Sequence, residues 1–266
     1  MKKLVYLLLL SLIVSSVHAQ DKALQAKFDS IIKEADLLYA YEKVAWNASD
    51  LMMSDSHLKS NCGGYLVYHS NDSLFATFYD KLVNQRIAKY YFTFADLEKP
   101  FRSETESASF SALEKGLIDI KLTILGQLSE KKFSVGIPQG YSPNFDMIKE
   151  KDGYRFYIIM GTSEEGEIPF GNDYLFMADK EGNIDSWQKF HSRMIPARNT
   201  GPNGEKVVSA IHSHLKTTPY ITATDICTFR LYAAMCDMKE FMVYSPATDQ
   251  YYKYNIDTNT ITISKP

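Results

Sequence analysis

Cysteine is scarce in this sequence, and its positions argue against a full disulfide framework. There are three cysteines, Cys62, Cys227 and Cys236, and an odd number cannot pair completely. Cys227 and Cys236 lie nine residues apart on one predicted helix, which separates them by about 13 Å at roughly 1.5 Å per residue. A disulfide cannot span that distance. Both are therefore interpreted as small buried apolar side chains.

The N-terminus also lacks an apolar run long enough to span a membrane. The run from Leu4 to Val14 is too short for this. Lys2 and Lys3 precede this run, and Val17-His18-Ala19 follows it, which together predict a secretory signal over residues 1–19. The residue directly after the cleavage site is Gln20 and not cysteine, which argues against a bacterial lipid anchor. We expect a protein that is exported to the periplasm or secreted, with no membrane span after cleavage.

No basic tract, internal repeat or low-complexity segment occurs. Removal of Lys2 and Lys3 leaves 27 Lys and Arg against 32 Asp and Glu, a formal net charge of −5. Because nucleic-acid binding requires clustered positive charge, it is not expected here.

What is present favours an α+β protein. About 247 residues remain after the signal, enough for one large or two ordinary domains, and the 18 Tyr and 15 Phe favour sheets. We predict an N-terminal helix-plus-sheet unit over 20–141 that has no chemistry of its own, and a mixed sheet flanked by helices over 142–266. The expected helices are 21–51, 108–128 and 226–238, and the expected strands are 65–69, 74–79, 86–94, 145–149, 154–161, 174–178, 183–195, 207–211, 240–245 and 250–255.

The most informative stretch begins at the end of the strand predicted for 207–211. His212 and His214 are two residues apart on an extended chain, so both side chains point to one face. After ten intervening residues, Asp225 opens a predicted helix, where its charge suits the helix N-terminus. Two imidazoles and one carboxylate form a three-ligand set that leaves a fourth position open, as in catalytic zinc sites.

His-x-His, ten residues and then Asp, with a hydroxyl residue three positions before the Asp, resembles the JAMM family of zinc metalloproteases and isopeptidases. The resemblance covers roughly residues 172–266. It implies that His212, His214 and Asp225 bind Zn²⁺ and that Thr222 helps to hold the tetrahedral intermediate, in place of the family's Ser. Two departures are Leu215, where the family usually has Pro, and Thr222 itself.

The resemblance also implies a general base at the start of a strand two strands before the His pair, here the strand predicted for 174–178. Glu167 is our first candidate for this base, and Asp173 is the alternative, with a side chain one methylene shorter. His191, on the strand before the motif, is interpreted in three ways: as a fourth ligand that would close the site, as a partner of a ligand, or as a locally hydrogen-bonded histidine.

Three functions follow from these residues. The first is an exported zinc hydrolase of JAMM type that cuts a peptide or isopeptide bond, with cell-wall peptides as candidate substrates. The second is a non-catalytic JAMM-like binding module that lacks a competent base. The third is a structural protein without metal. Whether the chain is an enzyme is left open by the sequence.

Overall fold

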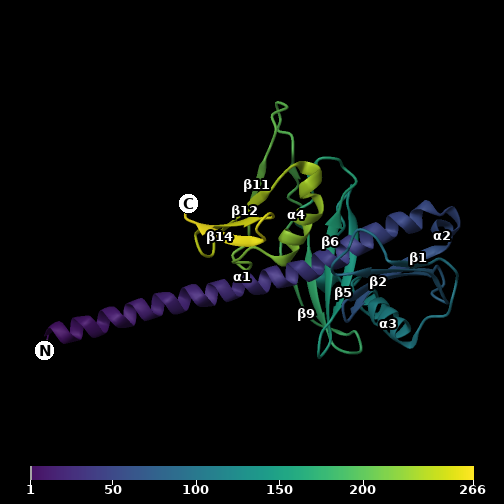
Figure 1. Cartoon of the computed structure of the whole chain (residues 1–266), viewed down its shortest axis with the longest axis horizontal. Helices are drawn as coiled ribbons and strands as arrows, with labels where there is room; N and C mark the ends of the chain where they lie inside the picture. The colour runs from purple at the N-terminus through teal and green to yellow at the C-terminus, as the bar shows by residue number, and fades with distance from the viewer. Residues whose placement is uncertain (1) are drawn as a thin grey trace.

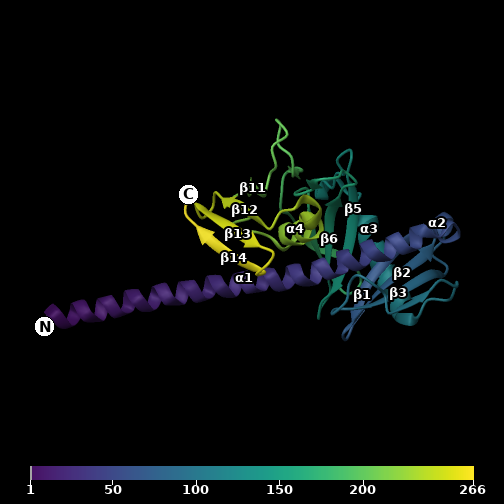
Figure 2. The same cartoon turned by 45° about the horizontal axis from the view of Figure 1, so that its top comes forward.

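The first helix, α1 (Lys2–Ser54), crosses the molecule from the C-terminal sheet to the first sheet (Figures 1 and 2). The computed structural model describes the backbone of residues 2–266 and the side chains of residues 22–266. The predicted signal at 1–19 lies outside the fully described residues, so export stays a prediction. Among the described residues, no helix combines the length and the apolar character that crossing a membrane would require.

A four-stranded antiparallel sheet follows α1 and the short helix α2 (Ser56–Asn61). Its first two strands form the predicted hairpin, with Asn71 in the left-handed region (φ 51°) at the turn. The strands, in their order across the sheet, are β1 (Cys62–Ser70), β2 (Ser73–Asp80), β3 (Arg86–Thr93) and β4 (Arg102–Glu104).

Helix α3 (Ala112–Gln127) begins four residues later than its apolar periodicity predicts. Ser111 is the N-cap, and its side chain and that of Glu114 form a reciprocal capping box. The cap fixes the start of the helix, because Ser111 satisfies a backbone N–H that an earlier start would leave without a partner. A short 3₁₀ turn, η1 (Lys131–Phe133), comes after the helix.

Glu114 also joins α3 to the first sheet. The Lys89 ammonium lies 2.9 Å from Glu114 Oε1, and Thr77 donates a hydrogen bond to the same oxygen at 3.0 Å. Burial alone would raise the pKa of Glu114, but the hydrogen bonds from Lys89 and Ser111 lower it to about 2. The stability that this carboxylate contributes is therefore present above pH 4.5, the ordinary value, and is lost as the pH falls towards 2.

We expect Glu114→Gln to lower the free energy of unfolding by about 3–5 kcal/mol, because it leaves the buried Lys89 ammonium without a counter-charge. Urea denaturation at neutral pH would measure the loss. Glu130→Gln is the control: its exposed pair with Lys132 predicts a change below about 1 kcal/mol. Equal effects of the two substitutions would show that the Lys89–Glu114 pair contributes no more to the free energy of unfolding than an exposed ion pair.

A second four-stranded antiparallel sheet follows α3 in the chain. Its first hairpin turns after Glu150, whose N–H donates to the Gly153 carbonyl at 2.8 Å. One face, with Phe156 and Ile158, packs against α3, and the other, with Tyr157 and Ile159, belongs to the core that contains α1. The strands, in their order across the sheet, are β5 (Ser142–Lys149), β6 (Tyr154–Gly161), β8 (Tyr174–Ala178) and β9 (Ile184–Lys189).

The third four-stranded sheet is mixed, and it contains the His-x-His motif. Strand β11 pairs in parallel with β12, and the helix α4 connects them, while the remaining pairs are antiparallel. A two-stranded ribbon, β7 with β10, packs beside α4. The elements are β7 (Glu167–Ile168), β10 (Ala197–Arg198), β11 (Ser209–Ser213), α4 (Ala223–Cys236), β12 (Glu240–Ser245), β13 (Gln250–Asn255) and β14 (Thr260–Ser264).

This architecture confirms the predicted α+β class, with a long N-terminal helix, antiparallel sheets and a C-terminal mixed sheet. The boundary predicted near residue 141 stays a prediction. One hydrophobic core joins residues from both sides of that position, among them Val44 of α1, Phe78 of β2 and Tyr157 of β6. A second core lies between α1, α4 and the mixed sheet, and it contains Phe229 and Phe241.

Candidate metal centre

The two motif histidines lie where β11 ends. His212 and His214 are buried while Ile211 and Ser213 are exposed, which is the alternation expected of an extended chain. The His212 ring packs against Phe170 and Phe241, with centroid distances of 5.1 and 6.1 Å. Aromatic packing thus fixes this ring, and its Nδ1 has no hydrogen-bond partner among the described residues.

Asp225 is held by the start of α4. Thr222 is the N-cap, and its side chain accepts a hydrogen bond from the Asp225 N–H. In return, Asp225 Oδ2 accepts from the Thr222 N–H at 2.9 Å and from the Thr222 hydroxyl at 2.6 Å. This capping box orients the carboxylate rigidly. It leaves Oδ1, which is buried and has no hydrogen-bond partner, facing the histidines.

His191 joins this group from the segment after β9. The Phe190 N–H donates to the Asp173 carbonyl at 3.1 Å, which places His191 beside Asp173. His191 Nδ1 lies 2.6 Å from Asp173 Oδ1, and the Thr224 hydroxyl donates to Asp173 Oδ2. Thr224 is in the first turn of α4, so β8, β9 and α4 together orient the His191 ring.

Four ligand atoms converge at the centre, from His191, His212, His214 and Asp225, all within 4.8 Å of one another. Asp225 Oδ1 lies 3.4 Å from His191 Nε2 and 3.3 Å from His212 Nε2. The two motif Nε2 atoms are 3.3 Å apart. A tetrahedral zinc site with bonds of about 2.0–2.1 Å has ligand atoms separated by about 3.3–3.4 Å. These three separations match edges of a tetrahedron of that size, and the other pairs of ligand atoms lie within 4.8 Å.

The hydrogen bonds on the outside of the cluster determine which ring nitrogens face inwards without a proton. His214 Nδ1 lies 2.8 Å from the Tyr220 carbonyl, an acceptor, so Nδ1 carries the proton and Nε2 presents a lone pair. His191 Nδ1 donates to Asp173, and its Nε2 has no hydrogen-bond partner. With neutral rings, two nitrogen lone pairs and a carboxylate oxygen would thus face one another in a buried space. Such an arrangement needs a cation between the groups, and it could hold a metal ion.

The pKa shifts of His191, His212 and Asp225 also indicate that the cluster requires a positive charge. Burial opposes the charged form of Asp225, but the imidazoles of His191, His214 and His212 hold its pKa well below the ordinary value. Burial would also lower the pKa of His191, yet the Asp173 and Asp225 carboxylates raise it to about 9. Burial lowers the pKa of His212. Without a metal, a proton on His191 supplies the missing positive charge.

Glu167, the first candidate for the general base, has other partners. The Tyr141 hydroxyl donates to its Oε1 at 2.8 Å and Arg198 Nε donates to its Oε2 at 3.1 Å. Its carboxylate is not in the group of four converging ligands. Asp173, the alternative, lies directly before β8 and contacts His191. The catalytic roles of Glu167 and Thr222 stay predictions, but the geometry favours Asp173 over Glu167 as the carboxylate beside the cluster.

Sequence reasoning left the role of His191 open and missed Thr224. The only sequence signal for Asp173 was its place at the start of a strand, and Thr224 carried no signal beyond its position before Asp225. The contacts between Asp173, His191 and Thr224 join residues up to 51 positions apart.

A search against known protein families, curated proteins and solved structures finds no match for this chain. The JAMM resemblance therefore rests on the motif residues alone.

The cluster is closed to solvent. The exposed fractions are 2% for His191 and Asp225, 4% for His214 and 7% for His212. Five surface cavities on the described part of the chain are all lined by other residues. A group that enters this centre is thus surrounded by protein on every side.

Proposed function

We propose that this chain is an exported zinc-binding protein whose metal ion is a permanent part of the fold. Four side chains supply the ligands: His191 and Asp225 in addition to the two motif histidines. The observation that carries the proposal is the free Asp225 Oδ1, which lies at tetrahedral-edge distances from the Nε2 atoms of His191 and His212. Four protein ligands and full burial are typical of structural rather than catalytic zinc.

The nature of the donors supports zinc over other divalent ions. Imidazole nitrogens suit Zn²⁺, Cu²⁺, Fe²⁺ and Ni²⁺, whereas Mg²⁺ and Ca²⁺ prefer six or more oxygen ligands. A compact arrangement with one carboxylate oxygen and three nitrogens suits the tetrahedral preference of Zn²⁺. The zinc ion would connect the segment after β9 and the end of β11 to the start of α4. In this reading the chain is a zinc-stabilised binding module, the second of the three functions that the sequence predicts.

A JAMM-type zinc hydrolase that cuts a peptide or isopeptide bond is the second candidate, and one observation favours it. Asp173 lies directly before β8, near where the resemblance implies the general base, and it reaches the cluster through His191. A zinc ion would polarise a substrate carbonyl and lower the pKa of a water molecule. His191 would then accept a proton at Nε2 instead of binding the metal, and cell-wall peptides are the substrates that export suggests.

Both candidate functions require a bound zinc ion, so the metal content of the purified protein tests both. We expect close to one zinc per chain by elemental analysis after incubation with zinc at neutral pH. We expect little zinc in the His212→Ala, His214→Ala double variant, because half of the ligand set is gone. A parent protein that takes up no zinc would overturn both candidates and leave a binding or structural protein without metal.

A further inference from the structure

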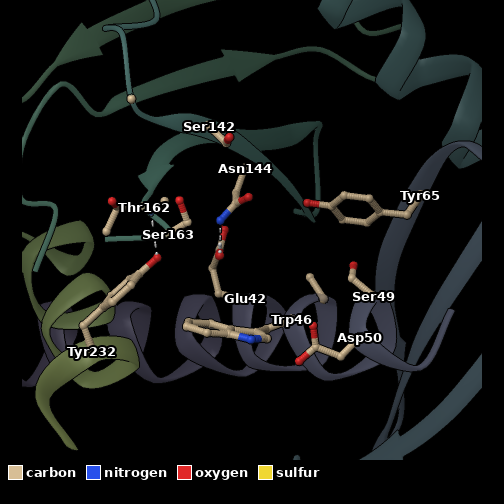
Figure 3. A pocket seen from close by; sticks show the side chains of 13 residues that line it. Glu42, Trp46, Ser49, Asp50, Tyr65, Ser142, Asn144, Thr162, Ser163 and Tyr232 are labelled. Carbon is tan, nitrogen blue, oxygen red and sulfur yellow. Dashed lines mark hydrogen bonds between the residues drawn. The ribbon is translucent and has the colours of Figure 1, made fainter. Parts of the chain in front are cut away.

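A cavity of about 330 Å³ lies beside α1, and none of the four metal-centre residues lines it. Figure 3 shows Glu42 and Trp46 on α1, with Asn144 of β5 facing them and Tyr232 of α4 at one end. The other labelled residues all have a hydroxyl or a carboxyl group: Ser49, Asp50, Tyr65, Ser142, Thr162 and Ser163. The volume is at the lower end of the range for ligand pockets, so it suits a single ring with its substituents.

The buried charges beside this cavity are balanced within the protein. Glu42 is 2% exposed and Asp146 is 1% exposed. A hydrogen bond joins their carboxyl groups, and it requires that the two groups share a proton. The Lys121 ammonium attracts both of them. One shared proton and one ammonium thus offset two carboxyl groups, so the deep end of the cavity favours a ligand without charge.

The polar groups of the lining retain hydrogen-bonding capacity towards a ligand. The Tyr232 hydroxyl accepts from the Thr162 N–H at 3.2 Å, and the Thr162 hydroxyl accepts from the Glu164 N–H at 3.0 Å. Because a hydroxyl can accept and donate at once, both can still donate. Asn144 donates through Nδ2 to Glu42 Oε2 at 2.7 Å, which leaves its Oδ1 as an acceptor. The cavity therefore offers uncharged donors together with an uncharged acceptor.

Trp46 adds an apolar wall to this polar lining. Its ring is tilted by 52° against that of Tyr232, with the centroids 5.4 Å apart, and it still lines the cavity. A saturated ring with C–H groups on its faces and hydroxyls at its edge matches both kinds of wall, because the face packs on the indole while the edge forms hydrogen bonds. A purely apolar ring would leave the polar groups without partners. An anion would find no Lys, Arg or His in the lining.

We propose that this cavity binds a neutral pyranose sugar, with one face of the ring against Trp46 and its hydroxyls at Asn144, Thr162 and Tyr232. Gly161 keeps the space between two of these groups open. A Cβ atom at Gly161 would lie 3.3 Å from the Tyr232 hydroxyl oxygen and 3.5 Å from the Asn144 amide nitrogen. The proposal does not depend on zinc or on the function of the metal centre.

The chain has two tryptophans, Trp46 and Trp187, which allows a direct test. In a Trp187→Phe background, the fluorescence of Trp46 reports on the cavity. We expect a saturable change with at least one of glucose, galactose and mannose, each titrated as the free sugar and as its methyl glycoside. Binding of the glycoside would extend the site to the end of a sugar chain, and binding of the free sugar alone would restrict it to monosaccharides. Cyclohexanol, a ring with a single hydroxyl, should bind at least about tenfold more weakly, because several hydrogen bonds are lost.

Gly161→Ala places a methyl group between Tyr232 and Asn144, so we expect it to weaken sugar binding at least about fivefold through the loss of a hydrogen bond. Gly116→Ala is the matched control: no atom lies within 4 Å of a Cβ at Gly116 of α3, and this variant should bind like the parent. If Gly161→Ala fails to fold, Ser163→Ala at the exposed edge of the cavity should weaken binding about threefold.

Three results would overturn the proposal. The first is the absence of a saturable signal with every sugar. The second is binding of glucosamine or glucuronate, which add a charge to the same ring, at least about tenfold more tightly than glucose, because the site would then select a charge. The third is parent-like affinity in both Gly161→Ala and Ser163→Ala, because the sugar would then bind elsewhere.

Discussion

Removal of zinc is expected to lower the melting temperature of this protein by about 8–16 °C. An ion present at a thousand times its dissociation constant contributes about 4 kcal/mol to the folded state. For a domain of this size, each kcal/mol corresponds to about 2–4 °C. The physical reason lies in the cluster itself: without the ion, only a proton on His191 offsets the charge of Asp225 in a space that excludes water, and the ion would bind all four side chains.

Thermal unfolding of the chelator-treated and zinc-reloaded protein would measure this shift. The His212→Ala, His214→Ala double variant is the control, because its melting temperature should not respond to zinc. Magnesium should not replace zinc in the parent, since three of the four ligand atoms are nitrogen. Identical melting temperatures with and without zinc would contradict a structural role for the metal, even if the metal binds.

His191→Ala is expected to weaken zinc binding by more than a hundredfold, because it removes one of four ligands. That exceeds the roughly 10–100-fold loss expected when an outer partner of a ligand is changed. Asp173→Asn should fall within this smaller range, since Asp173 only orients His191 through the hydrogen bond at Nδ1. Competition with a chromophoric chelator at neutral pH would give both affinities.

This pair of variants also separates the two candidate functions. If His191 serves as a proton acceptor in a hydrolase, His191→Ala should retain zinc at nearly the parent affinity while peptide hydrolysis is lost. If it is the fourth ligand, zinc is lost as well. Glu167→Gln is the matched control, because Glu167 is a buried carboxylate that bonds Tyr141 and Arg198 instead of the cluster. Loss of zinc in that variant would show a general effect on folding.

Local sequence patterns were sufficient for the parts of the site that depend on one element at a time. The two-residue repeat of a strand places His212 and His214 on one face, and only the covalent geometry of an extended chain is needed for this. Thr222 and Asp225 form a capping box through contacts within four residues, and this box starts α4 at Ala223, three residues before the predicted start at 226. The same reasoning explains why β12 and β13 match their predicted bounds, 240–245 and 250–255, without shift.

The start of α3 is a feature that apolar periodicity did not predict correctly. Apolar periodicity predicts a helix from residue 108, but the hydrogen bonds of Ser111 and Glu114 set the start at Ala112, and Glu114 is also paired with Lys89 of β3. Periodicity measures which face is buried, and it contains no information on which polar group satisfies the first backbone N–H groups.

The sequence by itself thus determined the α+β class, most of the strands, and the three ligands His212, His214 and Asp225 as a candidate metal set. Only the tertiary structure placed His191 as a fourth member, placed Asp173 and Thr224 behind it, and gave Glu167 other partners. It also brought Glu42 and Asn144, 102 residues apart, to one cavity. The reason is that these contacts join different elements across loops, and their geometry depends on how the sheets and helices pack, which no local spacing of residues encodes.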